Sequence, residues 1–166
     1  METGLFIGRF QPFHNGHLKS ITNVSTELDE LVIGVGSADS SHTSENPFTA
    51  GERIRMIDKS LELNETNVYI VPIVDIERNS VWVGHVESLC PRFDTVYTNN
   101  NLVNRLFKES GYNLENHKKV RRDEFSGTEV RRRIVEDENW KELVPEEVSK
   151  HINRIDGVQR LKMISD

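Results

Sequence analysis

Apolar runs rich in β-branched residues alternate along this chain with segments whose apolar positions recur at helical spacing. The runs span residues 5–7, 31–36, 68–74 and 93–97. Because parallel strands must be joined by long crossover connections, usually helices, this alternation predicts an α/β fold with a parallel sheet flanked by helices. A length of 166 residues fits one domain, 1–166, with a C-terminal helical part from about residue 145.

Local signals place several element boundaries. Thr49 followed by Glu52 reads as a capping box and predicts the start of a helix. Pro72 interrupts the third apolar run, which indicates a strand near an edge or end of the sheet. Gly111 is expected to end the helix before it, and a further helix is expected after Pro145.

The charge balance and the cysteine content narrow the classes of function. Asp and Glu total 27 against 21 Lys and Arg, and this net charge of −6 argues against a protein that coats nucleic acid or an anionic membrane. Cys90 is the only cysteine, so an internal disulfide is excluded and a reducing compartment is expected. The chain opens without a cationic leader and has no apolar stretch of about 18 residues. We therefore expect a cytoplasmic protein without a membrane partner.

The segment from Gly8 to His17 lies between the first expected strand and the first helix, where open α/β sheets bind ligands. If the helix begins near His14, His14 and His17 share one face of its first turn, beside backbone N–H groups and the positive end of the helix dipole. Gly16 would let a phosphate approach the backbone closely, and Arg9 could grip a phosphate oxygen. The segment therefore predicts a phosphate site.

Two other interpretations of His14 and His17 stay open. The pair could simply cap a surface helix, or it could bind zinc. Zinc is the weaker alternative because no cysteine or carboxylate lies nearby to complete a tetrahedral set. The position directly after a glycine-ended strand favours the phosphate site, and no protein metal site is expected.

A second candidate anion site lies near the other end of the chain. Ser126, Gly127 and Thr128 precede a helix that carries three consecutive arginines, of which Arg131 can reach a ligand held at the helix N-terminus. Arg132–Arg133 must point to other faces, and a solvated basic patch is the plainer interpretation of such a run. Two anion sites in one small acidic domain favour a shared polyanionic ligand.

The motifs His14-x-Gly16-His17 and Ser126-Gly127-Thr128-x-x-Arg131 resemble those of the nucleotidyltransferase superfamily of adenylyl- and cytidylyltransferases. The chain contains neither the Walker G-x-x-x-x-G-K-[ST] motif nor the G-x-G-x-x-G motif of dinucleotide oxidoreductases. Together with the segments 34–38, 46–53 and 75–85, the motifs make the chain similar to archaeal-type nicotinamide-nucleotide adenylyltransferases over nearly its whole length.

This resemblance implies a Rossmann-like fold and the transfer of AMP from ATP to nicotinamide mononucleotide, giving NAD and pyrophosphate with Mg²⁺ accompanying ATP. It implies that His14 and His17 contact the ATP phosphates and that Arg9 and Arg131 hold the triphosphate. The attack on phosphorus would be direct and in line, because a phosphate monoester near neutral pH needs neither a protein nucleophile nor a strong base. The expected ATP site comprises Gly8, Arg9, His14, Gly16, His17, Ser126, Gly127, Thr128 and Arg131.

The resemblance also assigns the other substrate and the assembly. Trp82 and Asn79 match the segment that holds the nicotinamide end, and Ser37 is also expected to bind this substrate. Trp82 could equally serve ordinary helix packing. A homo-oligomer is implied, with a hexamer as the candidate arrangement. Two departures affect loops expected to face the ligand: Thr98–Asn101 stands where relatives often read Ser-Gly-Asn-Pro, and Asp39 replaces a common glutamine.

Three other functions remain as alternatives. A related transferase could act on flavin mononucleotide, phosphopantetheine or a polyol phosphate, and a nucleotide sensor could bind ATP or NAD without turnover. A nucleic-acid-binding domain could use Arg121, Arg122 and Arg131–Arg133. The net charge and the lack of an aromatic-studded basic strand argue against the last of these.

Overall fold

The computed structural model describes residues 1–115 and 125–166. Its strands form one parallel five-stranded sheet in the order β3-β2-β1-β4-β5. The strands are β1 (Thr3–Gly8), β2 (Glu30–Val35), β3 (Asn67–Pro72), β4 (Thr95–Tyr97) and β5 (Asn113–Glu115). The chain moves outward from β1 through β2 to β3 and then crosses back to β4. The direction therefore switches between β1 and β4, and the carboxyl ends of these two strands are where such sheets bind ligands.

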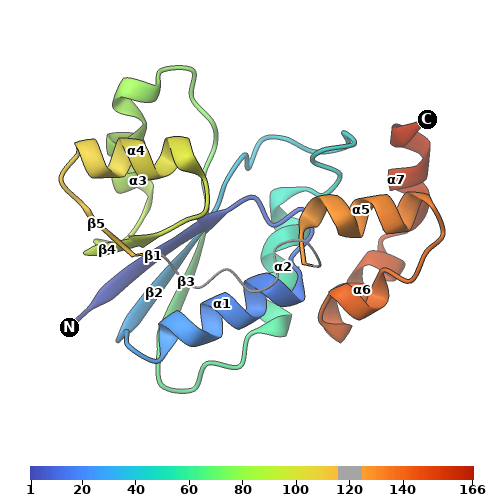
Figure 1. The fold of residues 1–166 in the computed structure, drawn as a ribbon, viewed down its shortest axis with the longest axis horizontal. Helices are drawn as coiled ribbons and strands as arrows, with labels where there is room; N and C mark the ends of the chain where they lie inside the picture. The colour runs from blue at the N-terminus through green and yellow to red at the C-terminus, as the bar shows by residue number, and fades with distance from the viewer. Residues whose placement is uncertain (116–124) are drawn as a thin grey trace.

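Helices cover both faces of the sheet and its carboxyl end (Figure 1). They are α1 (Asn15–Ser25), α2 (Ala50–Ser60), α3 (Trp82–Leu89), α4 (Asn101–Glu109), α5 (Gly127–Val135), α6 (Glu146–Arg154) and α7 (Gly157–Ser165), with 3₁₀ turns η1 (Asn79–Val81) and η2 (Lys141–Leu143). Side chains at alternate positions of β1 point to opposite faces of the sheet and pack against different helices. Phe6 packs in a cluster with side chains of α1 and α2, whereas Leu5 and Ile7 pack with those of α3 and α4.

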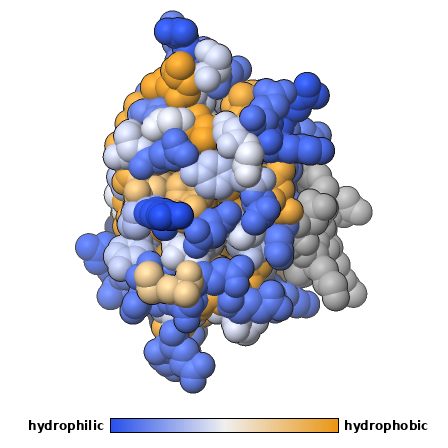
Figure 2. Space-filling model, turned by 90° about the vertical axis from the view of Figure 1, so that its left-hand side faces the viewer, coloured by the Kyte–Doolittle hydropathy of each residue, from blue (hydrophilic) through white to orange (hydrophobic). Residues whose placement is uncertain are grey.

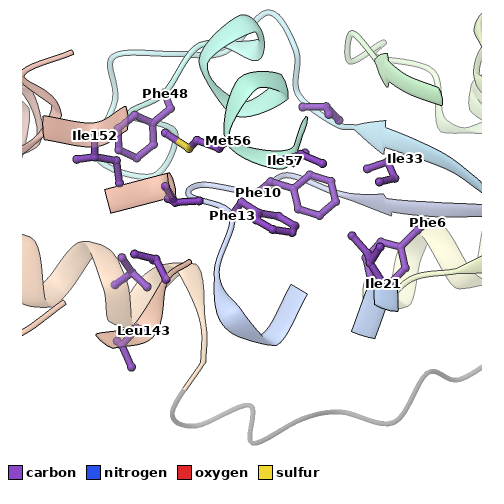
Figure 3. Close-up of a cluster of buried hydrophobic side chains, with 14 of the residues drawn as sticks. Phe6, Phe10, Phe13, Ile21, Ile33, Phe48, Met56, Ile57, Leu143 and Ile152 are labelled. Carbon is purple, nitrogen blue, oxygen red and sulfur yellow. The ribbon is translucent and has the colours of Figure 1, made fainter. Parts of the chain in front are cut away.

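Phe10 and Phe13, from the loop after β1, join the sheet to the C-terminal helices (Figure 3). Both rings are almost fully buried, and they lie between Ile33 of β2 and residues such as Ile152 of α6. The loop that precedes α1 is thus part of the core rather than a surface connection. Side chains of the predicted phosphate site therefore stand on a rigid base.

The C-terminal helices pack on the same domain, α6 against α2 and α7 against α5. Arg160 of α7 forms an ion pair of 2.7 Å with Glu52 of α2, and about four-fifths of each side chain is shielded from solvent. Leu161 is completely buried beside them in the core. Helix α7 thus packs on its own chain.

Most sequence expectations for the elements are confirmed. Thr49 and Glu52 form the reciprocal capping box of α2, and β3 is an edge strand that ends at Pro72. Two expectations were incomplete. The three-residue strand β5 was missed, and the segment after Pro145 forms two helices because Asp156, with φ of 54°, breaks the run.

The surface is largely polar, as the 29% content of charged residues leads one to expect. Figure 2 shows one face, on which hydrophobic side chains are dispersed among hydrophilic ones. Among the helices that the structure describes, none is long and apolar enough to cross a membrane.

Candidate functional site

A cavity of about 430 Å³ opens at the carboxyl ends of β1 and β4, at the switch point of the sheet. Every residue expected in the ATP site lines it, as do Ser37 and Trp82. Segments far apart in the sequence thus meet in one place. A larger hollow of about 750 Å³ lies between α2 and β3 and contains none of the predicted site residues.

His14 and His17 form a reciprocal capping box at the start of α1. The backbone N–H of His17 donates to Nδ1 of His14 at 3.3 Å, and the N–H of His14 donates to Nδ1 of His17 at 3.2 Å. The two rings stack with their centroids 3.6 Å apart. Because each Nδ1 accepts a hydrogen bond, the proton of each neutral imidazole resides on Nε2.

Burial keeps His14 neutral. Its side chain is nearly inaccessible, and this burial lowers its pKa to about 4. The histidines thus cap a helix, as one interpretation predicted, and they do so at the wall of a cavity. A contact between their Nε2–H groups and a phosphate stays a prediction.

Aromatic packing and a glycine fix the positions of these rings. The Phe10 ring contacts the His17 ring edge-on, with centroids 4.8 Å apart, and the Phe13 ring stacks on it with centroids 5.6 Å apart. A Cβ at Gly16 would come within 3.0 Å of the His14 ring and of Phe125. A side chain at position 16 would therefore require the His14 ring or Phe125 to shift, whereas the expected approach of a phosphate to this backbone stays a prediction.

Arg131 connects the end of the chain to the loop after β1. Its Nη1 donates to the carbonyl of Gln11 at 2.8 Å, and its Nη2 to the hydroxyl of Thr128 at 3.4 Å. Ser126 caps α5 by accepting a hydrogen bond from the N–H of Glu129 at 3.1 Å. The N-terminus of α5 thus faces the same cavity as the N-terminus of α1.

Two guanidinium groups concentrate positive charge in this cavity. Burial lowers the pKa of Arg131, and the positive charge of Arg9 lowers it further, against an opposing effect of Glu45. Arg9 itself donates to the side chain of Asn46 at 3.4 Å. A polyanion bound between the two arginines would relieve their mutual repulsion.

The other two arginines of the run point away from the cavity, as expected. Arg132 pairs with Glu129, Glu136 and Glu138, and Arg133 pairs with Glu129 and Glu142. Their charges are therefore engaged within the C-terminal region. Arg121 and Arg122, which the nucleic-acid alternative also needs, lie outside the described residues.

The residues predicted for the nicotinamide end lie in different places. Trp82 lines the cavity and also packs edge-on against Phe107 in the core, with ring centroids 5.7 Å apart. Asn79 begins η1 on the exposed surface and is not among the described residues that line the cavity. Its contact with a substrate stays a prediction.

The two departures from the family pattern have different positions. Thr98, Asn99 and Asn100 line the cavity, and the Asn100 side chain caps α4 by accepting from two backbone N–H groups. Asp39 instead accepts a long hydrogen bond of 3.5 Å from the backbone of Asp75. The Thr98–Asn101 loop thus supplies a helix cap and part of the cavity lining, whereas Asp39 is not among the described lining residues.

Two buried polar residues were missed by the sequence analysis. The Gln11 amide pairs with both backbone groups of Phe48, at 2.9 and 3.0 Å. Arg53 is completely buried under the cavity floor. One signal could have found Arg53: it precedes Met56 and Ile57 by three and four positions, so it shares their inward helix face.

The donors around the cavity suit a metal that arrives with its ligand. No cluster of three or more His, Cys, Asp or Glu side chains able to hold a metal is found in residues 1–115 and 125–166. Asp75 is the one carboxylate among the described lining residues. This set fits Mg²⁺ held mainly by phosphate oxygens and water.

Comparison with known proteins agrees with the sequence resemblance. Residues 5–133 match the cytidylyltransferase-like family. The nicotinamide-nucleotide adenylyltransferase of Haloarcula marismortui is 51% identical over 163 residues, covering 98% of this chain and 87% of its own. That of Archaeoglobus fulgidus is 53% identical over 166 residues, covering 96% and 95% of the two chains.

Solved structures show the same fold at low sequence identity. A bifunctional NMN adenylyltransferase/ADP ribose pyrophosphatase from Francisella tularensis, complexed with AMP and a manganese ion, superposes with a TM-score of 0.77 at 22% identity. The match covers 98% of this chain and 52% of that one, so this chain spans about half its length. The NadR protein in complex with NAD and AMP-PNP gives a TM-score of 0.65 at 16% identity, over 91% of this chain and 46% of that one.

Proposed function

The chain belongs to the nicotinamide-nucleotide adenylyltransferases of the cytidylyltransferase-like family, and from this premise we propose that its cavity is where AMP passes from ATP to nicotinamide mononucleotide. NAD and pyrophosphate are the products. The observation that carries this placement is the convergence of two helix N-termini, those of α1 and α5, on one cavity with Arg9 and Arg131.

The reaction requires positioning and charge stabilisation rather than a protein nucleophile. The 5′-phosphate of the mononucleotide attacks the α-phosphorus of ATP in line with the departing pyrophosphate, so one P–O bond forms as another breaks. That phosphate is already mostly deprotonated near neutral pH, so no general base is needed. The cavity accordingly offers imidazoles, guanidiniums and backbone N–H groups.

The histidines have distinct tasks in this scheme. His14, neutral and locked as the helix cap, donates from Nε2 to a phosphate oxygen. His17 donates from Nε2 to the α-phosphate, where negative charge grows during transfer, and is the main stabilising group. Arg9 and Arg131 hold the triphosphate from the opposite side.

Magnesium enters with ATP in this proposal. Its charge would be neutralised mainly by phosphate oxygens, with Asp75 the one carboxylate among the described lining residues. Bound there, the ion would stabilise the negative charge of the departing pyrophosphate.

At the other end of the cavity, we assign the nicotinamide ring to Trp82, a largely buried ring that lines the cavity and could stack on a pyridinium. Asn79 would bond the carboxamide, and Ser37, which lines the same cavity as Trp82, would also contact this substrate. The family resemblance supports this assignment. It also supports a homo-oligomer, with a hexamer as the candidate arrangement. The single cysteine supports a cytoplasmic location.

Pyrophosphate release by the purified protein with Mg²⁺ and ATP, with and without nicotinamide mononucleotide, tests the function. We expect release only with the mononucleotide, in a one-to-one ratio to NAD measured by chromatography. ATP binding without release would favour a nucleotide sensor. If ATP releases pyrophosphate only when flavin mononucleotide or phosphopantetheine replaces nicotinamide mononucleotide, another transferase of the superfamily is favoured.

A further inference from the structure

Arg53 of α2 is the largest completely buried side chain in the described part of the protein. Its guanidinium donates four hydrogen bonds, all to backbone carbonyls. The acceptors are Arg9 at 2.7 Å, Gly36 at 2.7 Å, Ser37 at 3.0 Å and Thr49 at 3.2 Å. The side chain therefore joins the loop after β1, the loop after β2 and the first turn of α2.

This cation has no ion-pair partner within the described residues 1–115 and 125–166. Glu52, its sequence neighbour, is bound to Arg160 instead. Burial lowers the pKa of Arg53 to about 10 and the charge of Arg9 lowers it further, against opposing effects of Asp75 and Glu52, so the group stays charged at neutral pH. A buried charge whose hydrogen bonds all go to backbone carbonyls is a costly arrangement, and a simple packing role would be served better by an apolar residue.

The carbonyls that Arg53 holds flank two residues in the left-handed region. Phe10 has φ of 55° and Ser37 has φ of 47°, conformations that residues other than glycine rarely adopt. The Arg9 carbonyl belongs to the peptide before Phe10, and the Gly36 and Ser37 carbonyls belong to the peptides on either side of Ser37. The guanidinium thus fixes the peptide planes around both unusual turns.

Both turns place side chains that face the substrates. The first turn aims Arg9 into the cavity and sets the Phe10 ring against His17 at 4.8 Å. The second turn puts Ser37 at the cavity wall. We propose that Arg53 is a positioning residue for adenylyl transfer: from beneath the cavity it holds the two strand-end turns in the geometry that presents Arg9, His17 and Ser37 to the substrates.

This inference rests on the proposed function and is tested by steady-state kinetics of Arg53→Lys and Arg53→Met, well below their melting temperatures. Lysine keeps the charge but cannot span four carbonyls, so we expect kcat/KM for ATP to fall about tenfold. Methionine keeps much of the volume of arginine but loses the positive charge and the hydrogen bonds, so we expect a larger fall in kcat/KM. Should Arg53→Met fail to fold, Arg53→Lys carries the test.

Two controls separate positioning from general destabilisation. Arg55→Lys changes the next arginine of α2, which is exposed. Ile57→Val removes a methyl group from a completely buried side chain of the same helix. Both should keep wild-type kinetic constants at the assay temperature, even where Ile57→Val lowers the melting temperature. If folded Arg53→Lys and Arg53→Met stay within twofold of the wild type, the inference is wrong. If the wild type and Arg55→Lys form no NAD, the proposed function itself fails.

Discussion

Nη1 of Arg131 donates a 2.8 Å hydrogen bond to the carbonyl of Gln11, a residue 120 positions earlier in the chain. This bond ties the N-terminal turn of α5 to the loop that enters α1. The distance between the two helix N-termini, and so the span available to a triphosphate, depends on it.

Gly127 lies where the two segments approach most closely. A Cβ there would come within 3.0 Å of the Gln11 carbonyl oxygen and of Nη1 of Arg131. We expect Gly127→Val to displace this bond and raise KM for ATP about tenfold, as steady-state kinetics will show. In Gly84→Ala, the added methyl meets no atom within 4 Å and should stabilise α3 by about 0.5–1 kcal/mol. That control should leave KM unchanged; equal KM values for both variants would refute the argument.

The three consecutive arginines should differ sharply in function. Arg131→Ala removes a group that lines the cavity, and we expect kcat/KM for ATP to fall at least tenfold. Arg132→Ala breaks ion pairs with Glu129, Glu136 and Glu138 outside the cavity, so kinetic constants should stay near wild type. A comparable kinetic loss in Arg132→Ala would show that the anion site extends along the helix.

Trp82 should link stability to recognition of the mononucleotide. Trp82→Ala removes a buried ring that packs on Phe107, so we expect a loss of about 3–5 kcal/mol in unfolding free energy and a higher KM for nicotinamide mononucleotide. Phe107→Leu disturbs the same cluster from the side away from the cavity. Denaturant titration and kinetics of both variants test this; a KM shift of equal size in Phe107→Leu would assign the effect to packing alone.

His14 should make the protein less stable in mild acid. Its pKa falls from 6.5 to about 4 on folding because of burial, so below pH 6.5 the unfolded chain takes up a proton that the folded protein does not. The stability from neutral His14 is complete above pH 6.5 and is lost as the pH falls toward 4. Between about pH 7.5 and about pH 5 the loss should be about 2 kcal/mol.

Urea unfolding of the wild type and of His14→Asn checks this expectation. Asparagine caps helices well and does not titrate, so the variant should lose about 2 kcal/mol less over the same range. His151, whose pKa is also lowered by burial, is present in both proteins and cancels. Parallel pH dependences would mean that His14 is not the group responsible.

The sequence was informative where a local rule decides the structure. Capping residues such as Thr49, the apolar runs and the spacing of His14 and His17 located the strands, the helix starts and the residues that line the cavity. It was uninformative where distant backbone groups meet. The carbonyls that Arg53 binds come from three segments, and no pattern within one segment records their convergence. The three-residue strand β5 likewise depends on pairing with β4 rather than on its own pattern.

The most direct test of the proposed mechanism is kcat for pyrophosphate release by His17→Asn at saturating ATP and nicotinamide mononucleotide. Asparagine can still accept the bond from the His14 N–H, but it lacks a donor at the Nε2 position. We predict a fall of about 10²-fold in kcat, with a smaller fall in His17→Gln, whose amide nitrogen can reach that position. A His17→Asn protein with nearly normal kcat would contradict the assignment of His17 as the group that stabilises the transferring phosphate.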